Sequence, residues 1–451
     1  MTPQAFWRSV LSKYWDRRPV RIERPDVPPI IQKSELFEVL VQQGELYRTG
    51  QAPVAIRAYI DGNQYSSRSH IESLLPEASD GSLERYAGRI AGMSAVKHWG
   101  LILNGYYRFS ELQRKRVLDF SVEIRRNVGI PTGGVTADIY VGNYLRTPFG
   151  VHKDEQHVFT WVVHGKKKIL LWPFECFAGF PGITPQHRNE AFRLPFQWNI
   201  PRRDDATVLE GSEGDIFYWP SSFWHIAASE GEFVATATVG FAWEGTAPHL
   251  ISDALQMFVQ TTAVKKYVQT GRRGATSEDL RRAARRLRRA IKDRPFDDVV
   301  EGILLARTQT LYLKDDIPNK DEPALTSADV VRCDIRSPVV WKRRGKSLLC
   351  AVYGRHFSVK ATPGMTRVLR LLNTGAPVSV GRVGGSFRGK IGGGAGKADV
   401  EAEVAGVLQI LRRLRFLHVV NDRSEKECPP GAARGIPAGR GPHPATTAGR
   451  R

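Results

Sequence analysis

The sequence predicts a mainly β core, followed by a helical segment and a smaller α+β unit. Residues 96–248 carry many short apolar runs separated by Gly, Pro and Asp, the residues that favour turns between strands. From residue 249 the apolar spacing changes to that of amphipathic helices, and from residue 321 two further helical patterns flank a glycine-rich loop. A chain of 451 residues is long enough for two or three domains and a sizeable core.

Composition narrows the class of protein. Apolar residues make up 41% of the chain and aromatic residues 10%, as in folded globular proteins and unlike disordered ones. No apolar run reaches the roughly 18 residues of a membrane span, and the N-terminus lacks the pattern of a secretory signal. The four cysteines, Cys176, Cys333, Cys350 and Cys428, lie far apart and form no C-x-x-C pair. We therefore expect a cytoplasmic protein without a disulfide framework or a cysteine zinc site.

The formal net charge is +20, from 66 Lys and Arg against 46 Asp and Glu. Such an excess predicts a polyanionic or acidic partner: RNA, a ribonucleoprotein or an acidic peptide. The alternative is that arginine only decorates the surface, because net charge informs on non-specific binding and not on fold.

Residues 1–95 are expected to lead into the core. The run QAFWRSVLSKYW (4–15) has the apolar spacing of a helix, and RRPVRIER (17–24) is typical of a short strand. Residues 96–248 should then form an all-β sandwich or barrel. Its strands are expected in the runs TADIYVG, HVFTWVV, KKKILLW, GDIFYW and EFVATATVGFAW.

Residues 249–320 are expected to be helical and offer a surface for a homodimer. One predicted helix is HLISDALQMFVQTTAVKKYVQ (249–269), and the second is TSEDLRRAARRLRRAIKDR (276–294). The second helix carries an apolar stripe of Leu280, Ala284, Leu287 and Ile291. Its other face holds Arg281, Arg282, Arg285, Arg288 and Arg289, which we expect to face solvent and bind the partner.

Residues 321–421 have the outline of a winged-helix module. Two helices are expected in TPGMTRVLRLLNTG (362–375) and VAGVLQILRRLRFLHVV (404–420), followed by a short β element. Residues 422–451 are rich in Pro, Gly, Ala and Arg and are expected to be disordered.

One stretch carries polar groups that strand formation alone does not explain: TPFGVHKDEQHVFTWVVHGKKKILLWP (147–173). His152 and Asp154 are two residues apart, so in a strand both side chains share a face. If that face lines a barrel, two metal-capable groups meet in a sheltered cavity. His157 has the opposite parity and should point to the other face of a continuous strand. We interpret His157 and His164 as strand and turn residues.

A third metal ligand is expected from GDIFYWPSSFWH (214–225). There a strand ends at Pro220 and a short loop delivers His225. Two histidines and one carboxylate match the facial triad that leaves open positions on non-haem Fe(II). The alternative for an H-x-D pair is two strand residues that form hydrogen bonds at the surface.

The lysine run follows the same parity. Lys167, Ile169 and Leu171 share one face of the predicted strand, and Lys166 and Lys168 the other. A lysine among inward apolar residues is costly unless an anion pairs with it, and a dicarboxylate cosubstrate would supply that anion. The alternative is that all three lysines extend outward to solvent.

These two runs resemble the JmjC-type, cupin-like 2-oxoglutarate-dependent protein hydroxylases. The H-x-D-E-Q run and its spacing to Lys167 are similar to the asparaginyl hydroxylase of hypoxia-inducible factor. YWDRRPVRI (14–22) and the order of core, helical segment and C-terminal unit are similar to the bacterial ribosomal oxygenases. The motif-level resemblance covers residues 5–245, and beyond residue 250 it is architectural only.

The resemblance implies a double-stranded β-helix core of the cupin/JmjC type and a role for particular residues. His152, Asp154 and His225 would be the iron ligands, and Lys167 would pair with the distal carboxylate of 2-oxoglutarate. Thr147 and Tyr140 would be further cosubstrate-binding residues. Where some members carry an asparagine on the strand after the distal histidine, this sequence has Gly240, so that part of the pocket should differ.

The function implied is hydroxylation of a protein or peptide side chain, with Fe(II), 2-oxoglutarate and O₂. An acidic or RNA-associated substrate would suit the net charge. Two alternatives stay open: a tailoring hydroxylase of a ribosomally made natural-product peptide, and a non-catalytic cupin-like basic binding protein.

Overall fold

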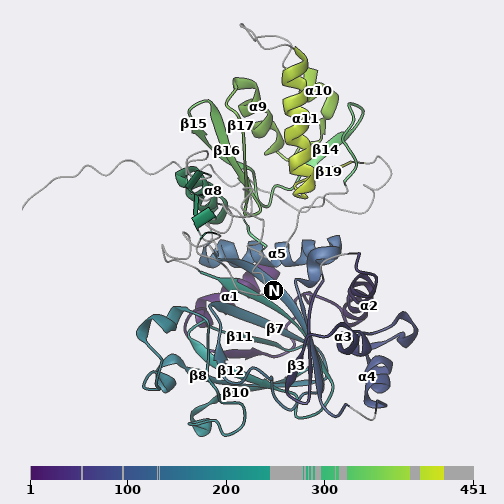
Figure 1. The fold of residues 1–451 in the computed structure, drawn as a ribbon, viewed down its shortest axis with the longest axis vertical. Coiled ribbons are helices and arrows are strands. Elements are labelled where there is room, and N and C mark those ends of the chain that lie inside the picture. Colours follow the sequence, from purple (N-terminus) through teal and green to yellow (C-terminus); the bar gives the residue numbers. More distant parts are fainter. Residues whose placement is uncertain are drawn as a thin grey trace, which may run out of the picture.

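The structure is a computed structural model, shown in Figure 1, in which the β-rich part lies below a smaller C-terminal part. The residues that it describes are 2–51, 54–93, 96–129, 131, 133–243, 278, 281–282, 284–285, 288–289, 296–309, 311–313, 322–385 and 397–420.

The larger layer of the β-rich part is an antiparallel sheet of eight strands in the order β1-β11-β7-β13-β5-β4-β2-β3. Its strands are β1 (Val20–Ile22), β2 (Ala55–Ile60), β3 (Asn63–Tyr65), β4 (Trp99–Asn104), β5 (Gly134–Gly142), β7 (Gln156–His164), β11 (Ile216–Trp219) and β13 (Val234–Ala242). The three strands from residues 1–95 thus belong to the same sheet as the strands that follow them.

The second layer is an antiparallel sheet of five strands in the order β10-β8-β12-β6-β9. Its strands are β6 (His152–Lys153), β8 (Lys166–Pro173), β9 (Phe192–Arg193), β10 (Thr207–Ser212) and β12 (Phe223–Ala228). A pocket between the layers is lined by side chains of both sheets, from β5, β7 and β13 on one side and from β6, β8 and β12 on the other.

Helices cover the other face of the large sheet. They are α1 (Pro3–Tyr14), α2 (Lys33–Thr49), α3 (Arg68–Leu74), α4 (Leu83–Ala91) and α5 (Glu111–Val128). Short 3₁₀ helices are η1 (Ala78–Asp80), η2 (Tyr106–Phe109), η3 (Phe174–Phe177), η4 (Pro185–Asn189) and η5 (Arg203–Asp205). α1 begins where Thr2 Oγ1 accepts a hydrogen bond from Ala5 N at 3.3 Å, with Pro3 in its first turn.

Alternation along β7 explains how one strand serves both faces. Phe159 and Trp161 point toward the helices, where the Trp7 ring of α1 meets them at centroid distances of 5.7 and 6.5 Å. Val158 and Thr160 point the other way and line the pocket. The period of two therefore sends aromatic residues to the core and smaller ones to the cavity.

The C-terminal part combines two three-stranded antiparallel sheets with helices, in the orders β18-β14-β19 and β15-β16-β17. Its elements are α8 (Phe296–Gln309), β14 (Val330–Cys333), β15 (Val340–Arg344), β16 (Ser347–Val352), β17 (Arg355–Lys360), α9 (Pro363–Leu372), β18 (Val378–Ser379), α10 (Val380–Gly385), α11 (Lys397–Arg413) and β19 (Leu417–Val419). The winged-helix arrangement stays a prediction.

The structure corrects one predicted helix. The helix expected over 404–420 ends at Arg413, and Leu417–Val419 is a strand that pairs with β14. Arg415 adopts a left-handed conformation with φ 58°, which no α-helix continues. Phe416 N then donates to Leu411 O at 2.9 Å, so the last turn closes on itself before the strand begins.

The prediction of a mainly β core with helices is confirmed, whereas the domain boundaries stay predictions. α5 was not predicted. The helix expected at 249–269 lies outside the described residues. The described residues of 276–294 are helical, and their five arginines are exposed, but so is Ala284 from the expected apolar stripe. Leu280, Leu287 and Ile291 lie outside the described residues. In the described part of the chain no helix has the length and apolar content needed to cross a membrane.

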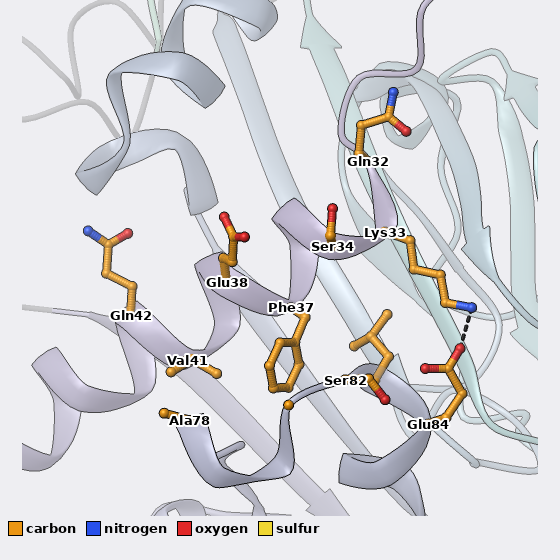
Figure 2. Close-up of a pocket in the computed structure, with 12 residues that line it drawn as sticks. Gln32, Lys33, Ser34, Phe37, Glu38, Val41, Gln42, Ala78, Ser82 and Glu84 are labelled. Atoms are coloured by element: carbon orange, nitrogen blue, oxygen red, sulfur yellow. Dashed lines mark ion pairs between the residues drawn. The ribbon is translucent and has the colours of Figure 1, made fainter.

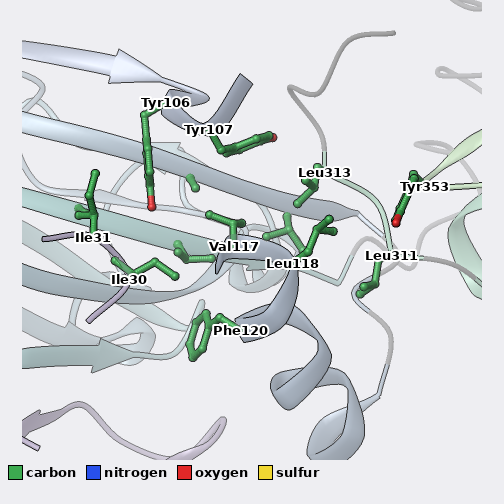
Figure 3. Packing of buried hydrophobic residues seen from close by; sticks show 14 of the residues in the cluster. Ile30, Ile31, Tyr106, Tyr107, Val117, Leu118, Phe120, Leu311, Leu313 and Tyr353 are labelled. Carbon is green, nitrogen blue, oxygen red and sulfur yellow. The ribbon is translucent and has the colours of Figure 1, made fainter. Parts of the chain in front are cut away.

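One apolar core joins the two parts of the chain. Figure 3 shows Leu118 of α5 beside Leu311, Leu313 and Tyr353, all of them in the same buried cluster. Leu313 forms a parallel bridge with Val135 at the start of β5.

Tyr312 lies in the middle of this junction, between two glycines. A Cβ on Gly134 would come within 2.8 Å of the Tyr312 ring, and one on Gly354 within 2.0 Å. Both glycines have positive φ, 93° and 71°, so backbone conformation and lack of space both favour glycine there.

Candidate metal centre

The structure brings His152, Asp154 and His225 together in the pocket between the two sheets. Each offers one ligand atom, and these atoms all lie within 4.8 Å of one another. The two imidazole rings are 4.1 Å apart between centroids, and His225 Nε2 lies 3.5 Å from Asp154 Oδ2. Among the described residues this is the one group of three or more His, Cys, Asp or Glu side chains with such spacing.

The local structure that produces this cluster differs from the prediction in two ways. β6 has only two residues, so Asp154 follows the strand instead of lying within it. His225 is not on a loop after Pro220 but within β12, where its backbone pairs with His152 on β6 and Leu171 on β8. Trp224 and Ile226 on either side of it pack into an apolar cluster away from the pocket. Strand alternation therefore directs His225 inward.

Burial keeps the imidazoles in the neutral form that binds metals. It lowers the pKa of His152, and it lowers the pKa of His225 to about 3. Burial raises the pKa of Asp154, but His152, His225 and Lys153 outweigh it, so the carboxyl is held below its usual value. Asp154 keeps 41% of its side-chain surface accessible and lines the pocket. The cluster thus offers two neutral nitrogens and one carboxylate.

These groups fit a divalent metal ion. His152 Nδ1 lies 2.9 Å from the Gly150 carbonyl, which can only accept, so Nδ1 carries the hydrogen and Nε2 keeps its lone pair. Such a hydrogen bond orients a metal-binding imidazole. Two imidazoles and one carboxylate are the donor set typical of non-haem Fe(II) sites.

Lys167 of β8 lies in the same pocket. Its side chain is 4% exposed, and burial lowers its pKa to about 7. Its Nζ donates to the Tyr144 hydroxyl and lies 4.8 Å from the centroid of the Tyr144 ring. No carboxylate of the described residues pairs with Lys167, so the pocket holds a buried amine without an anion.

The neighbouring lysines follow the predicted parity. Lys166 is exposed, and Lys168 pairs at the surface with Glu230 at 3.1 Å and Glu210 at 3.6 Å. Ile169 lines the pocket with Lys167. The alternation of β8 therefore separates one buried lysine from two solvated ones.

Thr147 and Tyr140 both line the pocket. Thr147 is tied to β12, because its N donates to Ala227 O at 2.8 Å and its Oγ1 accepts from Ala227 N at 3.3 Å. Tyr140 projects from β5, and burial raises the pKa of its phenol. Their roles toward a cosubstrate stay predictions.

Two residues were missed: Gln156, which lines the pocket, and Tyr144, the hydrogen-bond partner of Lys167. Gln156 stands in the quoted H-x-D-E-Q run, but its place depends on Gly240, since a Cβ there would lie 2.1 Å from Gln156 Oε1. Thr136 Oγ1 donates to the same oxygen at 3.2 Å. Gly240 was expected to change this part of the pocket because it has no side chain. The Gln156 amide occupies the space that Gly240 leaves. Tyr144 lies between strands, and no local pattern marks its approach to Lys167.

His157 and His164 lie outside the cluster, as expected. His157 stacks on Trp15 at 4.3 Å, and its Nδ1 is 3.1 Å from the Tyr218 hydroxyl. His152 and His157 do not share the one continuous strand that was predicted, but belong to different sheets. His164 ends β7, with Nδ1 3.4 Å from Glu213.

A larger cavity, of about 830 Å³, lies between α2 and α4. Figure 2 shows Phe37 and Val41 on its floor and the Lys33–Glu84 ion pair at one end. This cavity is wide and open, but its described residues include no metal-binding cluster and no unpaired buried charge. The smaller pocket between the sheets is the site with convergent chemical groups.

No protein-family model matches this sequence, and no curated protein is detectably similar to it. Among solved structures the chain is similar to Escherichia coli YcfD, with a TM-score of 0.45 and 15% identity over 92% of this chain and 98% of that chain. Two further structures describe YcfD as a ribosomal oxygenase. One is in complex with cobalt and 2-oxoglutarate (TM-score 0.42, 15% identity) and the other with cobalt and succinic acid (TM-score 0.44, 16% identity), over the same shares of the chains. Because these TM-scores are below 0.5, the chemistry below is drawn from the site's own residues.

Proposed function

We propose that this protein is an Fe(II)- and 2-oxoglutarate-dependent oxygenase that hydroxylates a side chain of a protein or peptide. The observation that carries the proposal is the placement of Lys167, a buried amine without an anion, in the pocket of the His152, Asp154 and His225 cluster. The core would then be a double-stranded β-helix of the cupin/JmjC type, as the sequence motifs imply.

His152, Asp154 and His225 would hold the iron, leaving positions open for 2-oxoglutarate and O₂. When bound, ferrous iron supplies the activation of O₂, one oxygen atom of which enters a substrate C–H bond while the other goes to succinate as 2-oxoglutarate loses CO₂. Lys167 would bind the distal carboxylate, with Tyr144 holding the amine in place. Thr147 and Tyr140 would complete the walls around the cosubstrate.

The two alternative functions are not favoured. In a non-catalytic binding protein, burial of the Lys167 amine beside three potential metal ligands would cost free energy without serving a function. A peptide-tailoring hydroxylase would share this chemistry and differ only in the identity of its substrate.

The test is succinate formation from 2-oxoglutarate by the purified protein with Fe(II) in air. We expect slow turnover without substrate, lost on adding a chelator and restored by Fe(II) but not by Mg²⁺. Absence of both metal binding and 2-oxoglutarate binding would refute the proposal.

A further inference from the structure

Arg57 lies two strands beyond Tyr140, on the face of the large sheet that carries the pocket. In the backbone register Arg57 on β2 pairs with Ile102 on β4, and Ile102 pairs with Tyr140 on β5. Side chains directly opposite in antiparallel strands point to the same face, so Arg57 shares the face of Tyr140, which lines the pocket. With neighbouring strands about 4.8 Å apart, β2 lies about 10 Å from β5, a span that an arginine side chain largely covers.

Arg57 is a cation without a partner in the described part of the chain. Its Nε is buried and makes no hydrogen bond there, and no carboxylate of the described residues forms an ion pair with it. Its charge reaches the Tyr140 phenol: burial and the Asp138 and Asp154 carboxylates raise the pKa of that phenol, and Arg57 lowers it. A partly buried guanidinium left unpaired is unfavourable, and a carboxylate would relieve the cost.

A second arginine lies beside the metal cluster. Arg193 of β9 pairs in backbone register with His152 and is exposed. Its guanidinium lies 5.5 Å from the centroid of the Phe149 ring. That ring in turn lies 4.8 Å from His152 and 5.9 Å from Tyr59, the neighbour of Arg57 on the same face of β2. Phe149 thus lies between the Arg193 guanidinium and Tyr59, on the His152 side of the pocket.

A carboxylate at Arg57 could come from two sources, the cosubstrate or the substrate. On the proposed function, 2-oxoglutarate uses one carboxylate at the metal and the other at Lys167, which lies on the opposite sheet. Neither carboxylate remains for Arg57.

We infer that Arg57, with Arg193 at the rim, binds a carboxylate of the substrate, so that the oxidised side chain lies beside an acidic residue. This inference rests on the proposed function and names the chemistry of its substrate. An acidic substrate would also agree with the positive net charge of the chain. Arg57 is a specificity residue and takes no part in holding the metal.

The first arm of the test identifies the source of the carboxylate. The affinity of the Mn(II)-loaded protein for 2-oxoglutarate is measured by calorimetry for wild type, Arg57→Gln and Arg8→Gln, an exposed arginine of α1 on the other side of the large sheet. We expect all three affinities to agree within about twofold. A loss of about tenfold or more in Arg57→Gln alone would assign the carboxylate to the cosubstrate and overturn the inference. Absence of binding in wild type would refute the proposed function instead.

The second arm identifies the substrate chemistry. Immobilised protein with Mn(II) and 2-oxoglutarate is offered a randomised peptide library, and retained peptides are sequenced by mass spectrometry. Wild type and Arg8→Gln should retain peptides enriched in Asp and Glu, whereas Arg57→Gln should lose about tenfold of that enrichment and Arg57→Lys only part of it. Arg193→Gln, at an exposed position, should reduce it by a smaller factor. An equal acidic content in the pools of wild type and Arg57→Gln, or no retained pool from wild type, overturns the inference.

Discussion

The two sides of the large sheet differ in the ionisable groups that are buried against them. On the helix-covered face, His157 has a ring stacked at 4.3 Å on Trp15 and a hydroxyl at 3.1 Å from its Nδ1. On the pocket face, Thr236 Oγ1 and Trp219 Nε1 are buried without a hydrogen-bond partner among the described residues. Across the pocket, on β8 of the smaller sheet, the Lys167 amine has only the Tyr144 hydroxyl. Buried polar atoms without a partner occur on the helix-covered side too, and Trp161 Nε1 is one of them. What distinguishes the pocket is a buried amine with no anion beside metal-binding side chains, and such a group indicates a missing ligand.

The largest effect is expected at the pocket face. Asp154→Ala removes the one carboxylate of the cluster, so metal affinity should fall more than about a hundredfold and turnover should be abolished. The stability to denaturant should stay near that of wild type, because Asp154 follows a two-residue strand and its side chain is 41% accessible. Metal titration checks the expected loss of affinity, and urea unfolding of the same samples checks the expected stability. Full activity in the variant would show that the cluster is not the metal site.

The next effect separates Lys167 from its neighbours. Lys167→Ala should raise the KM for 2-oxoglutarate by at least about a hundredfold, since losing one partner of a buried ion pair costs about 3–5 kcal/mol. Lys166→Ala is the matched control, and its KM should stay unchanged because that side chain is exposed. Steady-state kinetics at varied 2-oxoglutarate concentration measure the KM of both variants. Equal effects of the two substitutions would remove the distinction between the faces of β8.

The affinity for 2-oxoglutarate should also depend on pH, because Lys167 must be protonated to bind a carboxylate. The pKa of Lys167 in the free protein is lowered to about 7, and only the protonated amine attracts a carboxylate. Above pH 7 binding must therefore take up a proton, and the affinity for 2-oxoglutarate should fall about tenfold per pH unit. Below pH 7 this cause of pH dependence disappears. Calorimetry in buffers of different ionisation enthalpy would detect the proton uptake, which the Lys167→Ala variant should lack.

The smallest functional effect is expected on the helix-covered face. His157→Ala leaves a cavity between Trp15 and Tyr218 and removes one of the two hydrogen-bond partners of the Tyr218 hydroxyl, the other being Asp16 N. The free energy of unfolding should therefore drop by about 2–4 kcal/mol. Metal affinity and KM should not change in the folded protein. Denaturant unfolding beside metal titration measures both. A loss of metal affinity in the folded variant would mean that the two faces are not independent.

Much of the cluster follows from local patterns. The alternation that places Lys167 inward and Lys166 outward is a property of β8 alone, and the sequence is sufficient to infer it. His225 shows a limit of this reasoning, because its inward direction comes from β12, a strand that was predicted as a loop. The residues converge as predicted, although by a different local structure.

The remaining pocket residues depend on pairings between distant segments. Gln156 occupies the space over Gly240 only because β7 and β13 are neighbours in this register. Arg57 reaches the pocket face only because β2 and β4 extend the large sheet beyond β5. No local period encodes such neighbours, so these residues could not be found from the sequence alone.

The place of Tyr312 between Gly134 and Gly354 has a consequence for cooperativity. The glycine at the start of β5 and the one in the turn before β17 contact the same ring, and Leu311 and Leu313 on either side belong to the core that both parts share. Heat should therefore melt the β-rich part and the C-terminal part in one calorimetric transition. Replacing Gly354 by Ala forces a Cβ against that ring and should split the transition in two. The contact between the two parts around Tyr312 would then be lost before either part loses its own sheets.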